Sequence, residues 1–296
     1  MSEPTDALHT FQLQRAGVRG VIARLDHAWA EIRAQASLPP PVARQLGESL
    51  AASALFAGAL KFEGSLSIHL RNAGALRLMF AECTHDGHLR GIARVDEGPA
   101  ASAVDLHDPR ARLAITIENA RTETRYQGLV PVEADQLSTA FEGYFERSEQ
   151  LPTRIVLAER NGRCAGIMLQ LIAGSPEASA PLDSDGWNRA GHLLATLTAQ
   201  ELLELPVETL LLRLFHEEGV LLQPARPLRF RCSCSRQRVL GMLQALGPEE
   251  SVASLTEDGH MEVTCEFCNR IYRIDRIDVA SLFAGRPLAP ASDQAH

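Results

Sequence analysis

Four of the six cysteines stand in two close pairs near the end of the 296-residue chain. One residue separates Cys232 from Cys234, two separate Cys265 from Cys268, and positions 235–264 lie between the pairs. Two such pairs can complete a sulfur tetrahedron around one metal ion, a geometry that zinc accepts readily. The segment around them is too short for a large apolar core. We therefore expect the metal to stabilise it, since structural zinc contributes about 10–16 kcal/mol of apparent binding free energy.

The same four sulfurs are compatible with two roles. An inert zinc ribbon, which only holds a small domain together, is the commoner use of an all-cysteine site. Zinc also keeps its ligands as thiolates, the form that oxidants attack, and a disulfide is a poor ligand. Four cysteines allow three pairings, of which Cys232 with Cys234 and Cys265 with Cys268 are the nearest. Spacing alone leaves both roles open and favours the ribbon.

Charge and composition argue against some partners. The chain is 45% hydrophobic, as in globular proteins, and its net charge is −8. Lys61 is its only lysine and no basic run occurs, so nucleic acid is not the expected partner. The N-terminus lacks a secretory pattern, and no stretch approaches the ~20 apolar residues that span a bilayer. We expect a soluble, cytoplasmic protein, in which clustered cysteines indicate metal or redox chemistry.

Motifs of enzymes and nucleotide-binding proteins are missing. The sequence has no glycine-rich phosphate loop with its lysine, no Gly-x-Ser-x-Gly elbow and no His-Glu-x-x-His. We therefore predict that the protein is not an enzyme and does not use ATP.

Other candidate groups have simpler interpretations. Cys83, His85 and His88 flank an Asp-Gly turn, which is a poor place to preorganise a second metal site. Cys83 and Cys164 are expected to be small buried apolar residues. The His216-Glu-Glu218 run is interpreted as a solvated helix end.

Hydrophobic patterning divides the chain into three parts. Residues 1–176 alternate strand-like and helix-like patterns in hairpin order, which predicts an α+β domain with a largely antiparallel sheet and helices. Residues 177–226 begin with small, acidic and proline residues and continue with two amphipathic patterns, over 187–197 and 207–215, which predicts a flexible helical linker region. Residues 227–296 form a small C-terminal zinc-binding domain with a frayed tail. The linker helices either pack permanently on a neighbour or hide apolar faces that another state exposes.

The chain resembles the redox-regulated 33 kilodalton heat-shock chaperones, also called 33 kDa chaperonins. The resemblance includes the motifs Cys232-Ser-Cys234 and Cys265-Glu-Phe-Cys268, and it runs in order along nearly the whole chain. The other matching segments are residues 17–20, 60–64, 91–95, 125–128, 144–154, 215–218, 230–236 and 257–259. Gln237 departs from the family, which more usually has a glutamate there.

The resemblance implies an oxidation-activated holdase. In that family the reduced, zinc-bound form is inactive. Oxidants together with unfolding conditions form both disulfides, Cys232–Cys234 and Cys265–Cys268, and release zinc. The linker then unfolds, and the protein dimerises and holds unfolding clients without ATP. By resemblance the Cys265–Cys268 pair oxidises first.

Two other functions remain as alternatives. A zinc ribbon that binds nucleic acid is disfavoured because acidic residues outnumber arginines after residue 227. A thiol–disulfide oxidoreductase would place its Cys-x-x-Cys at the start of a helix, whereas Cys265 and Cys268 lie between two strand-like stretches.

Overall fold

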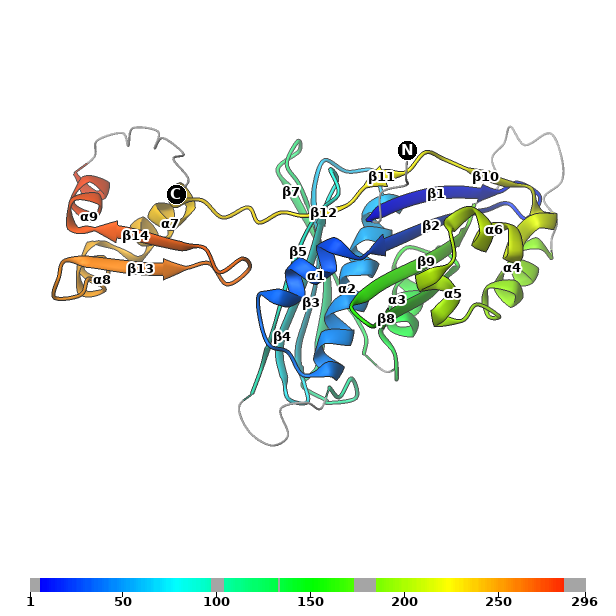
Figure 1. The fold of residues 1–296 in the computed structure, drawn as a ribbon, viewed down its shortest axis with the longest axis horizontal. Coiled ribbons are helices and arrows are strands. Elements are labelled where there is room, and N and C mark those ends of the chain that lie inside the picture. The colour runs from blue at the N-terminus through cyan, green and yellow to red at the C-terminus, as the bar shows by residue number, and fades with distance from the viewer. Residues whose placement is uncertain (1–5, 97–103, 133, 173–184, 285–296) are drawn as a thin grey trace. The chain divides into compact units, whose positions relative to one another are not determined.

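The chain is α+β, as predicted, in a computed structural model that describes residues 6–96, 104–132, 134–172 and 185–284 (Figure 1). It divides into two compact units, Met1–Arg231 and Cys232–His296. Most of the expected linker segment 177–185 and the tail beyond residue 284 lie outside the described residues. Among the helices that are described, none has both the length and the apolar character needed to cross a membrane.

The first unit contains two six-stranded sheets where the sequence predicted one largely antiparallel sheet. Sheet A is antiparallel in the order β10-β1-β2-β9-β8, and β11 also pairs with β1. Its strands are β1 (Ala7–Leu13), β2 (Val18–Leu25), β8 (Thr153–Arg160), β9 (Arg163–Leu171), β10 (Val220–Leu222) and β11 (Arg226–Pro227).

Sheet B has the order β12-β5-β4-β3-β6-β7, and its pairs are antiparallel except for β12, which runs parallel to β5. Its strands are β3 (Gly64–Ala73), β4 (Leu76–Thr84), β5 (His88–Val95), β6 (Arg112–Asn119), β7 (Thr124–Val130) and β12 (Arg229–Phe230). Alternation along a strand predicts that a strand exists but not which sheet it joins, so the sequence did not separate the two sheets.

Helix α2 (Pro40–Ala59) packs against strands of both sheets (Figure 1). Proline at its first turn suits a helix start, because that backbone nitrogen needs no partner. Leucines and small residues occur on every side of it, so it reads as a fully buried helix. Thirteen of its side chains are buried. Helices α1 (His27–Ala34) and α3 (Leu137–Ser148) complete this core with Trp29, Phe141 and Phe145.

Three short helices cover the other face of sheet A: α4 (Gly186–Leu194), α5 (Ala199–Glu204) and α6 (Val207–Phe215). Adjacent residues of one strand point to opposite faces, so Val21 and Ala23 join the α2 core while Ile22 joins the core under these helices. Phe215 stacks on Phe11 at 6.3 Å between ring centroids. The sequence predicted α4 and α6 but missed α5, a six-residue helix that starts with a capping box from Thr198.

The second unit is small. It comprises α7 (Arg236–Leu246), α8 (Pro248–Ala253), β13 (His260–Thr264), β14 (Ile271–Asp275) and α9 (Arg276–Phe283). Its core holds five buried side chains: Leu240, Leu243, Met261, Ile274 and Val279. Ile271, Ile277 and Met242 are about half exposed or more. This apolar core is small for a unit of this length, as the sequence predicted.

Candidate metal centre

The four cysteines come from two short segments of the second unit. Cys232 and Cys234 directly precede α7, whose first turn is capped by the Ser235 hydroxyl. Cys265 and Cys268 lie in the connection between β13 and β14. There the Cys265 amide donates to the Arg270 carbonyl at 2.9 Å, and the Asn269 amide donates to the Cys265 carbonyl at 2.8 Å. Cys265 and Cys268 are therefore held on a tight turn, and Cys232 and Cys234 on a short extended segment that ends at the start of α7.

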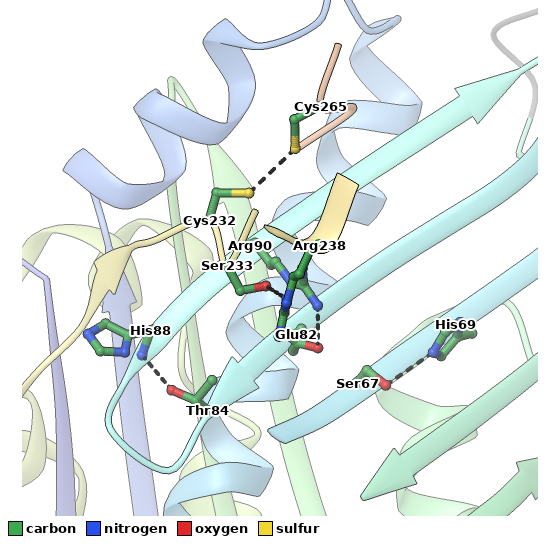
Figure 2. Close-up of polar contacts among 10 residues, drawn as sticks. All are labelled: Ser67, His69, Glu82, Thr84, His88, Arg90, Cys232, Ser233, Arg238 and Cys265. Carbon is green, nitrogen blue, oxygen red and sulfur yellow. Dashed lines mark hydrogen bonds and ion pairs between the residues drawn. The ribbon is translucent and has the colours of Figure 1, made fainter. Parts of the chain in front are cut away.

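All four sulfurs lie within 4.8 Å of one another. The Sγ atoms of Cys232 and Cys265 are 3.6 Å apart (Figure 2). Those of Cys234 and Cys268 are 3.4 Å apart. A tetrahedron with metal–sulfur bonds of 2.3 Å has edges of about 3.8 Å, so this cluster could hold one metal ion. The four cysteines are free thiols, because a disulfide would need sulfurs about 2.05 Å apart.

Two short sulfur–sulfur contacts join one cysteine pair to the other. Cys232 faces Cys265, and Cys234 faces Cys268. In a tetrahedron every sulfur has three neighbours at similar distances, so the reduced geometry selects no disulfide pairing. The pairings Cys232–Cys234 and Cys265–Cys268 stay predictions.

Tyr272 is a partner of the cluster that sequence reasoning missed. It lies on β14, and its hydroxyl donates to the Cys234 sulfur at 3.1 Å. Burial opposes ionisation of Cys234, but hydrogen bonds from Tyr272 and the other thiols outweigh it and lower the pKa of Cys234 to about 7. Burial raises the pKa of Cys232 and of Cys268. The available signal was a tyrosine four residues after a Cys-x-x-Cys, on the following strand.

Two arginines of α7 connect the first cysteine pair to the rest of this unit. Arg238 donates to the Ser233 hydroxyl at 2.6 Å (Figure 2). Arg236 donates to the Arg273 carbonyl at 2.6 Å and pairs with Asp278, which also caps α9. Gln237, where the family has a glutamate more usually, is exposed. The segment with Cys232 and Cys234 is thus tied to α7 by Arg238, and α7 is tied to β14 and α9 by Arg236.

The remaining cysteines are buried in the first unit, as the sequence predicted. Burial raises the pKa of Cys83 to about 12 and raises that of Cys164 well above its usual value. Near Cys83, the ring of His85 accepts a hydrogen bond from the Gly64 amide and lies 3.3 Å from Asp86. Over the described ranges, the group of residues able to hold a metal ion is the four-cysteine cluster.

The prediction of a solvated helix end at residues 216–218 was wrong for Glu218. His216 and Glu217 are exposed, but Glu218 is only 2% exposed. Its carboxylate accepts two hydrogen bonds from Arg189 of α4, at 2.5 and 3.0 Å. A buried carboxylate needs such a partner, and this partner stands 29 positions earlier in the chain. No local pattern could have predicted it.

Comparison with known proteins places the chain in one family. The family model described as "Hsp33 protein" matches residues 6–275. A 33 kDa chaperonin of Pseudomonas syringae pv. tomato is 40% identical over 98% of both chains. One of Azotobacter vinelandii is 41% identical over 95% of both chains. The crystal structure of a 33 kDa chaperonin from Thermotoga maritima has the same fold, with a TM-score of 0.78 at 20% identity over 94% of this chain and 97% of that one. The chain therefore belongs to the Hsp33 family.

Proposed function

We propose that this Hsp33-type chaperone is an ATP-independent holdase that oxidation switches on. The observation that carries the proposal is the cluster of four free thiols in a unit whose described residues, 232–284, form a core cluster of five buried side chains. A unit of this kind depends on its ligand for folding. Oxidation of the four thiols would therefore destabilise this unit, because it removes the ligands of the metal.

The bound ion is proposed to be Zn²⁺, held by Cys232, Cys234, Cys265 and Cys268. Sulfur-only tetrahedral sites suit zinc or an iron–sulfur cluster, and the observed spacing fits a single ion. Zinc has no redox chemistry of its own, so oxidation would act on the thiolates. Each disulfide formed gives two electrons to peroxide, which takes up two protons and leaves as water. Two disulfides remove all four ligands, and the metal leaves.

The disulfides are proposed to form within the pairs, Cys232–Cys234 and Cys265–Cys268. Once the metal leaves and the unit loosens, the contacts between the pairs are no longer enforced. One or two intervening residues then keep the partners of each pair close. A nearby resolving thiol also lets oxidation stop at the reversible disulfide.

The helices of the proposed linker region, residues 177–226, supply the hidden client surface. Leu202, Leu210, Leu214 and Phe215 are buried against sheet A. Complete burial of such a side chain stabilises the packed state by about 1.5–3 kcal/mol. Loosening of these helices would expose two complementary apolar faces, one on the helices and one on the sheet. We propose that unfolding clients bind there and that activated protein dimerises.

The same proposal specifies which partners are not required. Neither ATP nor nucleic acid takes part, in keeping with the net charge of −8 and the absence of a phosphate loop from the sequence. The protein acts in the cytoplasm and is not an enzyme. The position of Cys265 and Cys268 between two strands gives no support to a thioredoxin-like oxidoreductase.

The test follows zinc release, free thiols and client aggregation together while the protein is treated with peroxide at raised temperature. We expect four thiols and one zinc ion to be lost as protection of a thermally unfolding client appears. Cys268→Ser should bind zinc more weakly, whereas Cys83→Ser, a buried cysteine outside the cluster, should behave as wild type. Equal client protection by the reduced and oxidised proteins would refute the regulation. Freshly reduced protein without metal would refute the zinc site.

A further inference from the structure

The chain between the two units crosses the edges of both sheets in the first unit. We call residues 226–231 the strap. Its first strand, β11, pairs with β1 of sheet A, and its second, β12, pairs with β5 of sheet B. The next residue is Cys232, a proposed metal ligand. The strap therefore connects the strands of both sheets directly to the proposed metal site in the sequence.

β12 occupies a position at which β5 would otherwise be the edge of sheet B. The Arg229 amide donates to the Gly87 carbonyl, and the Arg231 amide donates to the Leu89 carbonyl, each at 3.0 Å. These bonds use main-chain atoms only, so any extended chain could make them. The carbonyls of Gly87 and Leu89 define what we call the β5 edge.

Side chains of the strap alternate as in a half-buried strand. Leu228 is 5% exposed and belongs to the core around α2, and Phe230 packs against the same core. Arg229, between them, is exposed. β12 contacts α1 as well as β5, so the two apolar side chains enter between a helix and a strand edge. A chain that binds along this edge of sheet B therefore needs an apolar side chain at every second residue.

Gly87 makes the close approach of the strap possible. A Cβ at this position would lie 2.5 Å from the Pro227 carbonyl oxygen and 3.3 Å from Leu228. The turn from Asp86 also holds Gly87 at φ +80, a left-handed conformation that favours glycine. Main chain thus passes against main chain here, as it does where an extended peptide joins a sheet.

The strap is weakly attached compared with its neighbours. β12 pairs over two residues, whereas β4 pairs with β5 over seven registered positions. Further up the strap, the Leu228 amide donates to the Asp6 carbonyl at 3.0 Å and the Arg226 side chain donates to the His85 carbonyl. Arg229 and Arg231 are exposed, so β12 itself is held by a short ladder and the Phe230 side chain when the chain that follows is unfolded.

We propose that the β5 edge, once the strap has left it, binds an extended segment of an unfolding client with apolar side chains at alternate positions. The client segment takes over the main-chain bonds to Gly87 and Leu89 and the positions of Leu228 and Phe230. This inference rests on the proposed function, in which loss of the metal unfolds the segment that begins at Cys232. The strap is then an internal copy of the client, and it blocks the site in the reduced protein.

The first test uses a fluorescent peptide with the sequence of residues 224–231. Fluorescence anisotropy should show saturable binding to the oxidised full chain. The same peptide with Leu228→Ser and Phe230→Ser should bind about 100-fold more weakly, because each apolar anchor contributes about tenfold. A peptide with Arg229→Ser should bind like the parent. Equal binding of all three peptides, or no binding to oxidised protein, would overturn the proposal.

The second test opens the site without oxidant. The full chain with Leu228→Ser and Phe230→Ser should bind the parent peptide while still reduced and zinc-loaded, whereas the Arg229→Ser chain should not. Zinc content and circular dichroism check that both variants are folded. If the double variant does not fold, the peptide series on wild-type protein decides the question.

Two further outcomes would contradict the inference. If the oxidised protein is a dimer that excludes the peptide until it dissociates, the occupant of the β5 edge is the strap of a second copy and the proposal fails. If the oxidised protein protects clients but the peptide neither binds nor competes with them, the β5 edge is not a client site. In that case the redox-switched holdase remains supported, so the two failures are distinguishable.

Discussion

Replacement of Glu218 by glutamine should loosen the helices that cover sheet A. Arg189, near the start of α4, donates to both oxygens of this carboxylate, at 2.5 and 3.0 Å. The backbone around Glu218 is also bound to the β1–β2 turn, because its carbonyl accepts from the Arg15 amide at 3.0 Å and the Gly219 carbonyl accepts from the Gln14 amide. The ion pair thus joins α4 to the point where the helical layer meets the sheet.

The size of the effect follows from burial on the two sides of the pair. Removal of one member of a fully buried pair costs about 3–5 kcal/mol. Glu218 is 2% exposed, but the Arg189 side chain is 36% exposed, so water weakens the interaction and can solvate the remaining guanidinium. We therefore expect Glu218→Gln to lose about 1–2 kcal/mol, which increases opening of the layer by a factor of about 5–30.

Hydrogen–deuterium exchange of the reduced, zinc-bound protein measures this opening directly. Amides of α4 and α6 should exchange faster in Glu218→Gln by that factor, and client protection should begin at lower peroxide exposure. Glu217→Gln is the matched control. The Glu217 carboxylate is 78% exposed, so this substitution should leave both the exchange rates and the onset of client protection unchanged. Equal exchange in the two variants would show that the ion pair does not hold the helices.

Two more predictions address the metal centre and the core. Tyr272→Phe removes the hydroxyl that donates to Cys234, so we expect zinc affinity in a chelator competition to fall about 10-fold, and an unchanged affinity would contradict that role. Burial, aided by Glu159 and opposed by Arg44, raises the pKa of Glu48 to about 7 from a usual 4.5. A carboxyl with a raised folded-state pKa stabilises the folded state most at low pH, so about 3 kcal/mol should be lost as pH rises from 4.5 to 7. Glu48→Gln should remove most of this fall from a series of Tm measurements between pH 5 and 8, and an unchanged slope would refute it.

The candidate site was largely predictable because its information is local. Two cysteine pairs with short internal spacing predicted that four sulfurs come together, and they lie within 4.8 Å of one another. The contribution of Tyr272 was not predictable, since it depends on the register of β14 against the cysteine turn. Which sulfur faces which also depends on the folded geometry. Local spacing therefore predicted which four cysteines come together but not their environment.

The fold was predictable wherever a strand or helix carries its own periodicity. The α2 helix and the β3–β4 hairpin follow from their sequence patterns. The shortest helices and strands could not be predicted from their sequence patterns. α5 has six residues, and β10, β11 and β12 have two or three, which is too few to show a period. These strands exist because long-range pairing with β1 and β5 provides their hydrogen bonds.

The position of α2 has a consequence for the way in which the first unit loses its structure. One helix supplies core residues to both sheets, so neither sheet can separate without exposing it. The strands and helices that pack on α2 should consequently melt as one cooperative block, whereas α4, α5 and α6, which pack in a separate core on the other face of sheet A, can open first. The core around α2 then keeps both sheets in place while those helices are open, so that they can pack again on an intact sheet.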